Sequence, residues 1–256
     1  MRPLLAIGFR SFSRFVELDG FDRAMALAGQ AFAALLPLLI VVGSVSPAHD
    51  DSLADSLIER FDLSGSAAEP LRAAVAQPPH AGISGLGVIL LVISALSFTR
   101  AMQRLYIRAW RLDKLGLRAN YWGLIWLGLF VAFWSAQPAI VGLTSGVVAF
   151  ALSLALSAAL WLLTPWLLTA RAIPWRRLLP QAVLTAIGLL ALTIGAAVYL
   201  PHAVATASAE FGILGVAFSL LSLLFALSLV LVATAALGAT LAEPRWPSHD
   251  DGPRHD

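Results

Sequence analysis

The residues of this chain that are best suited to bind a ligand are four arginines that follow an uncharged stretch. Their spacing of four, four and three residues places them at Arg100, Arg104, Arg108 and Arg111. At about 100° per residue they form one stripe, about 80° wide, on a helix that continues beyond the uncharged stretch. A row of guanidiniums can hold phosphate oxygens bidentately, so the stripe favours the anionic headgroups of membrane lipids as ligands. Membrane orientation alone is a second explanation, because Lys and Arg concentrate on the cytoplasmic side of membrane proteins.

Other polar residues lie beside the arginines or inside uncharged sequence. Gln103 and Trp110 fall on other faces of the same predicted helix, and Gln30, Gln137 and Pro138 are surrounded by apolar residues. Polar side chains within membrane helices commonly pack against neighbouring helices, and prolines free backbone carbonyls there. We therefore predict interface or packing roles for these five residues.

The sequence has no pattern that indicates catalysis. There is no cysteine, which excludes thiolate metal sites and thiol nucleophiles. The His and Asp residues of segment 244–256 could collect a divalent metal, but a disordered polar end is the preferred interpretation. A metal-dependent nuclease needs clustered carboxylates or histidines, and the acids predicted on the cytoplasmic side are scattered among separate segments. We predict no enzyme activity, no cofactor, no metal site and no nucleic-acid partner.

The uncharged stretches predict an all-α, polytopic membrane protein. The chain is 59% hydrophobic and 12% charged, against about 45–50% and about 25% in soluble proteins. Its longest uncharged stretch, 119–170, would be about 78 Å long as one helix, so it must fold back, near residues 142–146. About 20 residues per crossing predicts six transmembrane helices. They are placed at about 24–45, 81–99, 121–142, 147–169, 178–200 and 212–241.

The basic residues predict how the chain is oriented in the membrane. With these six spans, all of the 17 Lys and Arg except Arg60 and Arg72 fall on one side. Lys and Arg near the ends of spans are retained on the cytoplasmic side. We therefore predict that both termini are cytoplasmic, which requires an even number of spans.

Segments outside the spans complete the predicted organisation. Residues 4–21 combine helical periodicity with a basic edge, which is typical of an interfacial helix that anchors the first span or controls substrate access. The outer loop 46–80 is predicted to carry two short helices and to cap the outer surface. Residues 1–243 then form a single membrane domain, and 244–256 form a disordered cytoplasmic tail.

Several segments resemble a known family. The stretches FSRFVELDGFDRAMALAGQAFAALLPLLIVV, SGLGVILLVISALSFTRAMQRLYIRAW, IPWRRLLPQAVLTA and FGILGVAFSLLSLLFALSLVLVATAALGATLAE are similar to the YihY/virulence-factor BrkB family of bacterial inner-membrane proteins. The segment from Arg100 to Trp110 carries the most specific part of the resemblance. The chain departs from the family at Thr240, where the usual residue is Glu, and at Gln30 and Phe32, where tyrosines are common.

The resemblance implies a six-span protein of the bacterial cytoplasmic membrane, with relatives linked to envelope integrity, serum resistance or lipid export. Members have also carried a ribonuclease BN label, which the scattered acids of this chain argue against. The leading hypothesis is the transport or handling of a lipid or another amphipathic envelope component. The alternative is a structural or regulatory membrane protein that docks a partner and transports nothing.

Overall fold

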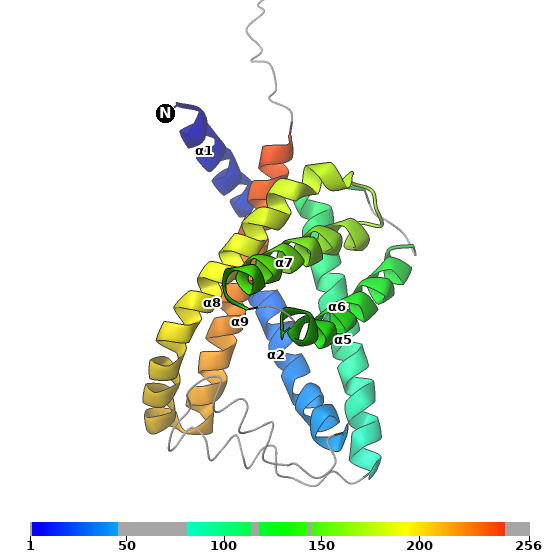
Figure 1. The fold of residues 1–256 in the computed structure, drawn as a ribbon, viewed down its shortest axis with the longest axis vertical. Coiled ribbons are helices and arrows are strands. Elements are labelled where there is room, and N and C mark those ends of the chain that lie inside the picture. Colours follow the sequence, from blue (N-terminus) through cyan, green and yellow to red (C-terminus); the bar gives the residue numbers. More distant parts are fainter. Residues whose placement is uncertain (1, 46–80, 114–117, 143–144, 244–256) are drawn as a thin grey trace, which may run out of the picture.

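The structure, a computed structural model, describes residues 2–45, 81–113, 118–142 and 145–243. Within these ranges the regular structure is entirely helical, which confirms the predicted all-α class (Figure 1). The predicted outer loop 46–80 and tail 244–256 lie outside the described residues. The helices are α1 (Arg2–Glu17), α2 (Gly20–Val45), α5 (Ala81–Ala109), α6 (Arg118–Gly142), α7 (Gly146–Leu168), α8 (Trp175–Phe211) and α9 (Ile213–Ala242).

Two helices extend well past the apolar stretches from which they were predicted. Helix α5 continues beyond position 99 to Ala109, and α8 has 37 residues and ends at Phe211. Hydropathy marks only the part of a helix that suits hydrocarbon, whereas the backbone hydrogen bonds continue into polar sequence. Pro201 inside α8 removes one of these hydrogen bonds without ending the helix.

The chain is a polytopic membrane protein. In the described ranges four segments are long and apolar enough to cross a bilayer: Gly87–Ala109, Gly146–Leu168, Trp175–Phe211 and Leu214–Ala242. Helix α6 contributes a shorter apolar segment, Tyr121–Phe133. Helices α2 and α6 coincide with two further predicted spans, and the count of six crossings stays a prediction.

Small residues let α9 pack closely against its neighbours. Its alanines at 235, 236 and 239 are at most 1% exposed. Opposite α8 the approach is closer still, because a Cβ atom at Gly238 would lie 2.4 Å from the Cβ and 2.8 Å from the Cα of Gln181. Close backbone approach through small residues is a common device in membrane helix pairs, where lipid supplies no hydrophobic driving force between helices.

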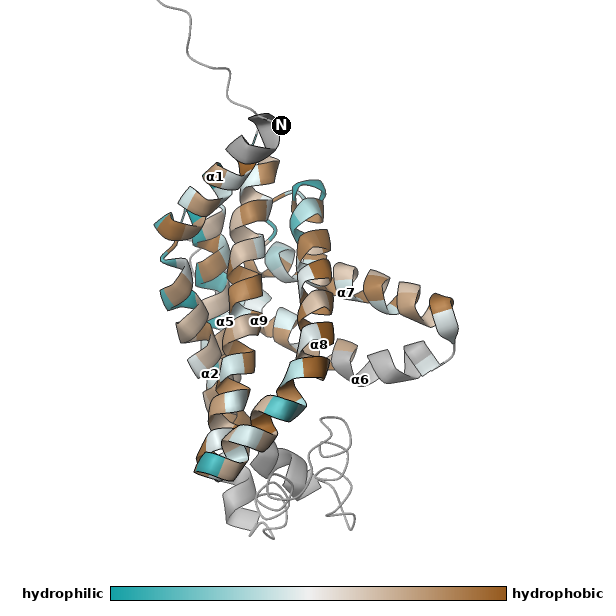
Figure 2. Cartoon of the chain, turned by 90° about the vertical axis from the view of Figure 1, so that its left-hand side faces the viewer, coloured by the Kyte–Doolittle hydropathy of each residue, from teal (hydrophilic) through white to brown (hydrophobic). Residues whose placement is uncertain are grey.

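Helices α6 and α7 form a hairpin that projects sideways from the other helices (Figure 2). Its two helices are joined by the Trp126 indole, which is 2% exposed and donates a 3.1 Å hydrogen bond to the Thr164 hydroxyl. Near the base of the hairpin, the Arg171 guanidinium lies 4.3 Å from the ring centre of Trp122 and 4.4 Å from that of Trp166. A guanidinium between two indoles makes favourable cation–π contacts, which fix the connection between α7 and α8.

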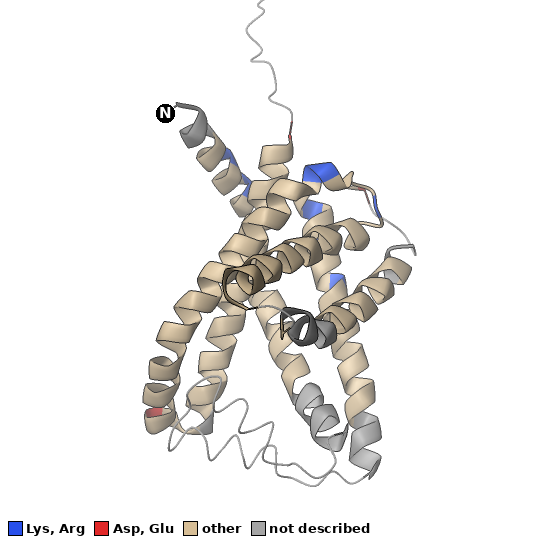
Figure 3. Ribbon diagram, in the orientation of Figure 1, with Lys and Arg blue, Asp and Glu red and all other residues tan. Residues whose placement is uncertain are grey.

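The arginines of the described ranges lie towards one end of the long helices, together with acids such as Glu17 and Glu243 that pair with them. Figure 3 shows Lys and Arg on α1, α5 and the start of α8, towards the end where the N-terminus lies. The far end of the α8–α9 pair carries an acidic residue instead (Figure 3). This separation is the pattern from which the orientation was predicted; the compartment that each end faces stays a prediction.

Candidate functional site

Helix α5 presents three of the four predicted arginines on one exposed face. Its opposite face is buried in the core, with Met102, Leu105 and Tyr106 at most 1% exposed. Burial of that face leaves Arg100, Arg104 and Arg108 exposed at four-residue intervals. Arg100 lies nine residues before the C-terminal end of α5, about 14 Å along the helix axis. The three arginines therefore span about the last 14 Å of the helix.

The fourth arginine does not continue the stripe, contrary to the sequence prediction. Helix α5 ends at Ala109, and Arg111 has a left-handed backbone with φ 49°. The Leu112 N–H donates to the Ile107 carbonyl at 2.9 Å and closes the helix end. The Arg111 side chain then forms an ion pair with Glu17 of α1 at 2.9 Å, so its guanidinium is already occupied.

A different arginine, Arg23 in the first turns of α2, joins the face instead. Burial, and after it the charges of Arg108 and Arg104, hold the pKa of the Arg23 guanidinium below its usual range, against the opposing charge of Asp19. Arg23 also donates a hydrogen bond to the carbonyl of Leu18. Three like charges from two helices therefore lie close together, and we call Arg23, Arg104 and Arg108 the basic face.

A small cavity lies within the basic face. Its volume is about 70 Å³, which is room for several water molecules. Arg23, Arg104 and Gln30 contribute its polar lining. The Gln30 carbonyl oxygen is buried and has no hydrogen-bond partner among the described residues. A buried oxygen without a partner is costly, so the cavity suits a polar occupant.

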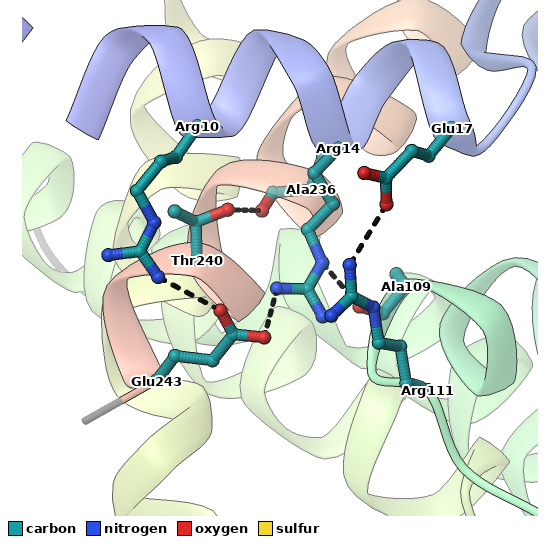
Figure 4. A network of polar contacts seen from close by, with 8 residues as sticks. All are labelled: Arg10, Arg14, Glu17, Ala109, Arg111, Ala236, Thr240 and Glu243. Atoms are coloured by element: carbon teal, nitrogen blue, oxygen red, sulfur yellow. Dashed lines mark hydrogen bonds and ion pairs between the residues drawn. The ribbon is translucent and has the colours of Figure 1, made fainter. Parts of the chain in front are cut away.

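Helix α1 is held to the ends of α5 and α9 by a second polar network (Figure 4). Arg14 is 6% exposed; it donates from Nε to the Ala109 carbonyl at 3.0 Å and pairs with Glu243 at 2.5 Å. Arg10 pairs with the second oxygen of Glu243 at 3.1 Å. Burial acts to raise the pKa of Glu243, but the hydrogen bond from Arg14 and the charges of Arg14, Arg111 and Arg10 outweigh it and lower the pKa.

With its polar edge turned to the other helices, α1 exposes its apolar side. Phe9, Phe12 and Val16 are 75%, 64% and 56% exposed. In water this arrangement would be unfavourable, whereas at a membrane surface the apolar side can enter the acyl region. The arrangement is that of an interfacial helix fixed to the protein through its charged edge.

The remaining predicted residues lie within helix packing or outside the described side chains. Gln103 is 5% exposed, and a Cβ at Gly123 of α6 would come within 2.9 Å of its amide nitrogen. Trp110 donates from its indole to the Gln181 side chain at 2.9 Å and so connects α5 to α8. Gln137 and Pro138 belong to α6, in a part whose side chains lie outside the described residues.

Sequence reasoning missed the partners that complete these contacts. Arg14 and Glu243 are 229 positions apart, and no spacing rule pairs residues at such a distance. Gln181 is a single polar residue in an apolar run, which was a detectable signal for a specific partner. Arg23 was read only as one of the basic residues that orient the chain, because its proximity to α5 depends on how α2 packs.

The helices and the basic end described above define the class of this protein: a polytopic α-helical membrane protein with an arginine-rich face at the end that carries the termini. The family model described as virulence factor BrkB matches residues 11–256. The chain therefore belongs to the virulence factor BrkB family, as its resemblance predicted. No curated protein and no solved structure matches the chain.

Proposed function

We propose that this protein handles an anionic lipid, most directly as a transporter, and binds the lipid phosphate at the basic face. The observation that carries the proposal is the convergence of Arg23, Arg104 and Arg108 from two helices, where the charge of Asp19 opposes the arginine charges that act on Arg23. Like charges repel, so their proximity is favourable when an anion binds between them. Guanidiniums suit phosphate because their fork of N–H donors matches its oxygens.

The position of the basic face favours a membrane lipid as the source of the phosphate. Arg104 and Arg108 lie within the last two turns of a helix that is apolar enough to cross a bilayer. This is the depth at which lipid headgroups meet the end of a membrane helix. Arg100, about one turn deeper than Arg104, extends the same exposed face along α5. A lipid leaving the headgroup layer would therefore meet further basic groups.

The proposal places the protein in the bacterial cytoplasmic membrane, with six spans and with both termini and the basic face in the cytoplasm. The distribution of basic residues supports this orientation. The proposal includes no catalytic step. Two acids at that end, Glu17 and Glu243, are ion-paired with arginines.

The direct test measures binding of phosphatidylglycerol to the purified protein by native mass spectrometry. Phosphatidylcholine, which has no net charge, is the comparison. Each basic residue near an anionic surface contributes about 1 kcal/mol, so the double variant Arg104→Gln/Arg108→Gln should lose about 2 kcal/mol, or about 30-fold in affinity. The matched control is Arg176→Gln/Arg177→Gln, which removes two exposed arginines at the start of α8. Raising the salt concentration should weaken binding to the wild type more than to the double variant.

Two results would contradict the binding proposal. The first is phosphatidylglycerol binding that is unchanged in the folded double variant. The second is an equal loss in both pairs of variants, which would favour the interpretation that the arginines only orient the chain. Transport is tested separately, by following fluorescent phosphatidylglycerol across the bilayer of proteoliposomes. Binding without movement would support the structural or regulatory alternative.

A further inference from the structure

A large cavity lies between α8 and α9 at the end of the helix pair remote from the termini. Its volume is about 650 Å³. Close contacts lie on both sides of it along the pair. Towards the termini a Cβ at Gly188 would lie 2.8 Å from Val230, and at the far end a Cβ at Gly215 would lie 2.0 Å from the Ala207 carbonyl oxygen. The cavity is a surface groove along the α8–α9 pair between these two contacts. Leu200 of α8 still packs against Leu223 of α9 there, and the lining residues Tyr199 and Phe218 are exposed.

The lining of this cavity changes from apolar to polar along α8. The deeper part is formed by Leu192, Leu200 and Leu223, together with the small residues Gly195 and Ala196. Leu200 is 5% exposed and belongs to a small buried cluster with Leu223, so α8 and α9 are in contact at this wall.

The polar part follows on the same helix, at His202, Thr206 and Glu210. Their four-residue spacing places the three side chains on one face of α8. No Lys or Arg lines the cavity within the described part of the chain. The charged group at its mouth is thus a carboxylate.

The dimensions of the cavity match those of a membrane leaflet. From Leu192 to His202 the helix rises about 15 Å, which is half the thickness of the hydrocarbon core. From His202 to Glu210 it rises a further 12 Å or so, which is enough to carry Glu210 out of the hydrocarbon core. The apolar part therefore lies at the depth of acyl chains and the polar part at the depth of headgroups.

We propose that this cavity binds a zwitterionic phospholipid with a primary ammonium headgroup. An acyl chain occupies the apolar part, and the ammonium group pairs with Glu210. His202 and Thr206 offer hydrogen-bonding groups to the phosphate region between them. A lipid whose only headgroup charge is the phosphate would meet the Glu210 carboxylate without a compensating cation, so the site discriminates against it. This site is separate from the basic face and does not depend on it.

The test is retention of phosphatidylethanolamine against phosphatidylglycerol by the full chain, measured by native mass spectrometry. The Arg104→Gln/Arg108→Gln background is used, so that the basic face does not contribute. We expect at least a tenfold preference for phosphatidylethanolamine. Glu210→Gln should abolish the preference while leaving the bound lipid detectable, because it removes the charge and keeps the shape of an exposed side chain.

A second pair of variants tests the acyl-chain part of the cavity. Gly195→Leu places a side chain in it, and a Cβ at position 195 meets no atom within 4 Å, so the new side chain begins in open space. Gly128→Leu in α6 is the matched control, since a Cβ there also meets nothing within 4 Å. Gly195→Leu should reduce phosphatidylethanolamine retention at least fivefold, and Gly128→Leu should not.

Equal retention of phosphatidylethanolamine and phosphatidylglycerol by the Arg104→Gln/Arg108→Gln protein would overturn the proposal. Equal effects of Gly195→Leu and Gly128→Leu would also overturn it. Either outcome would identify the bound molecules as unselective surrounding lipid. Neither outcome bears on the basic face, whose own test uses phosphatidylglycerol and intact arginines.

Discussion

The docking of α1 depends on Glu243, and Glu243→Gln should release this helix from the rest of the protein. Glu243 accepts hydrogen bonds from Arg14 and Arg10, whose side chains are 7% and 46% exposed. A hydrogen bond to a charged group contributes about 1.5–3 kcal/mol, and an exposed ion pair contributes at most about 1 kcal/mol. The Glu243 side chain is itself 36% exposed, so solvent screening lowers both contributions. We expect a loss of about 2 kcal/mol, or about 30-fold in the docking equilibrium.

Spin labels can measure this release directly, because the chain has no cysteine. Phe9→Cys on α1 and Leu241→Cys on α9 place labels at two exposed positions. The distance distribution should be narrow in the otherwise unchanged protein and should broaden in Glu243→Gln. Glu17→Gln is the matched control, because its ion pair with Arg111 joins side chains that are 55% and 63% exposed and contributes little. Similar broadening in both variants, or none in Glu243→Gln, would refute the reasoning.

The same labels should report a pH dependence. Because the pKa of Glu243 is lowered in the folded protein, the stabilisation from its carboxylate is fully present above the pKa of an unfolded glutamate, about 4.3. It is lost as the pH falls through the lowered value, when the carboxyl becomes protonated. Helix α1 should therefore stay docked at neutral pH and loosen in acid. In Glu243→Gln this acid-dependent step should be absent.

Three further substitutions test the helix packing. Gly238→Ala should cost about 1–3 kcal/mol, because the new Cβ would overlap the backbone of Gln181; thermal unfolding of Gly238→Ala and of Gly128→Ala as control checks this. Trp126→Phe removes the hydrogen bond to Thr164 and should lower the free energy of unfolding by about 1 kcal/mol. Lipid binding should not change. Arg171→Gln removes both cation–π contacts, about 0.5–1 kcal/mol each, and should increase proteolysis between α7 and α8.

Helix positions were predictable where one physical signal decided them. The uncharged stretch 119–170 was too long for one crossing, and two glycines marked the place where it folds back. In the structure α6 ends at Gly142 and α7 begins at Gly146. The exposed face of α5 was predictable for the same reason, because arginines at four-residue intervals share a face only while the helix continues.

The composition of the basic face could not be predicted, because it depends on tertiary contacts. Arg111 leaves the stripe because α5 closes at Ala109 through a left-handed residue that is not glycine, and no glycine marked that end. Arg23 enters because α2 packs beside α5, which hydropathy does not specify. A periodic pattern predicts which residues share one helix face, and packing decides which residues of another helix meet them.

The positions of the two proposed lipid sites follow from how α8 and α9 pair. Near the start of α8 the helices approach so closely that a Cβ at Gly238 would lie 2.8 Å from the Cα of Gln181. The charged contacts there are made by α1, α2 and α5 and by Glu243 at the end of α9. At the other end the cavity lies along the pair between the close contacts at Gly188 and Gly215. One end of the molecule thus carries arginines on α2 and α5, and the other carries the Glu210 carboxylate at the mouth of the α8–α9 cavity. A single zwitterionic lipid carries groups that match both, whereas a purely anionic lipid matches only the first.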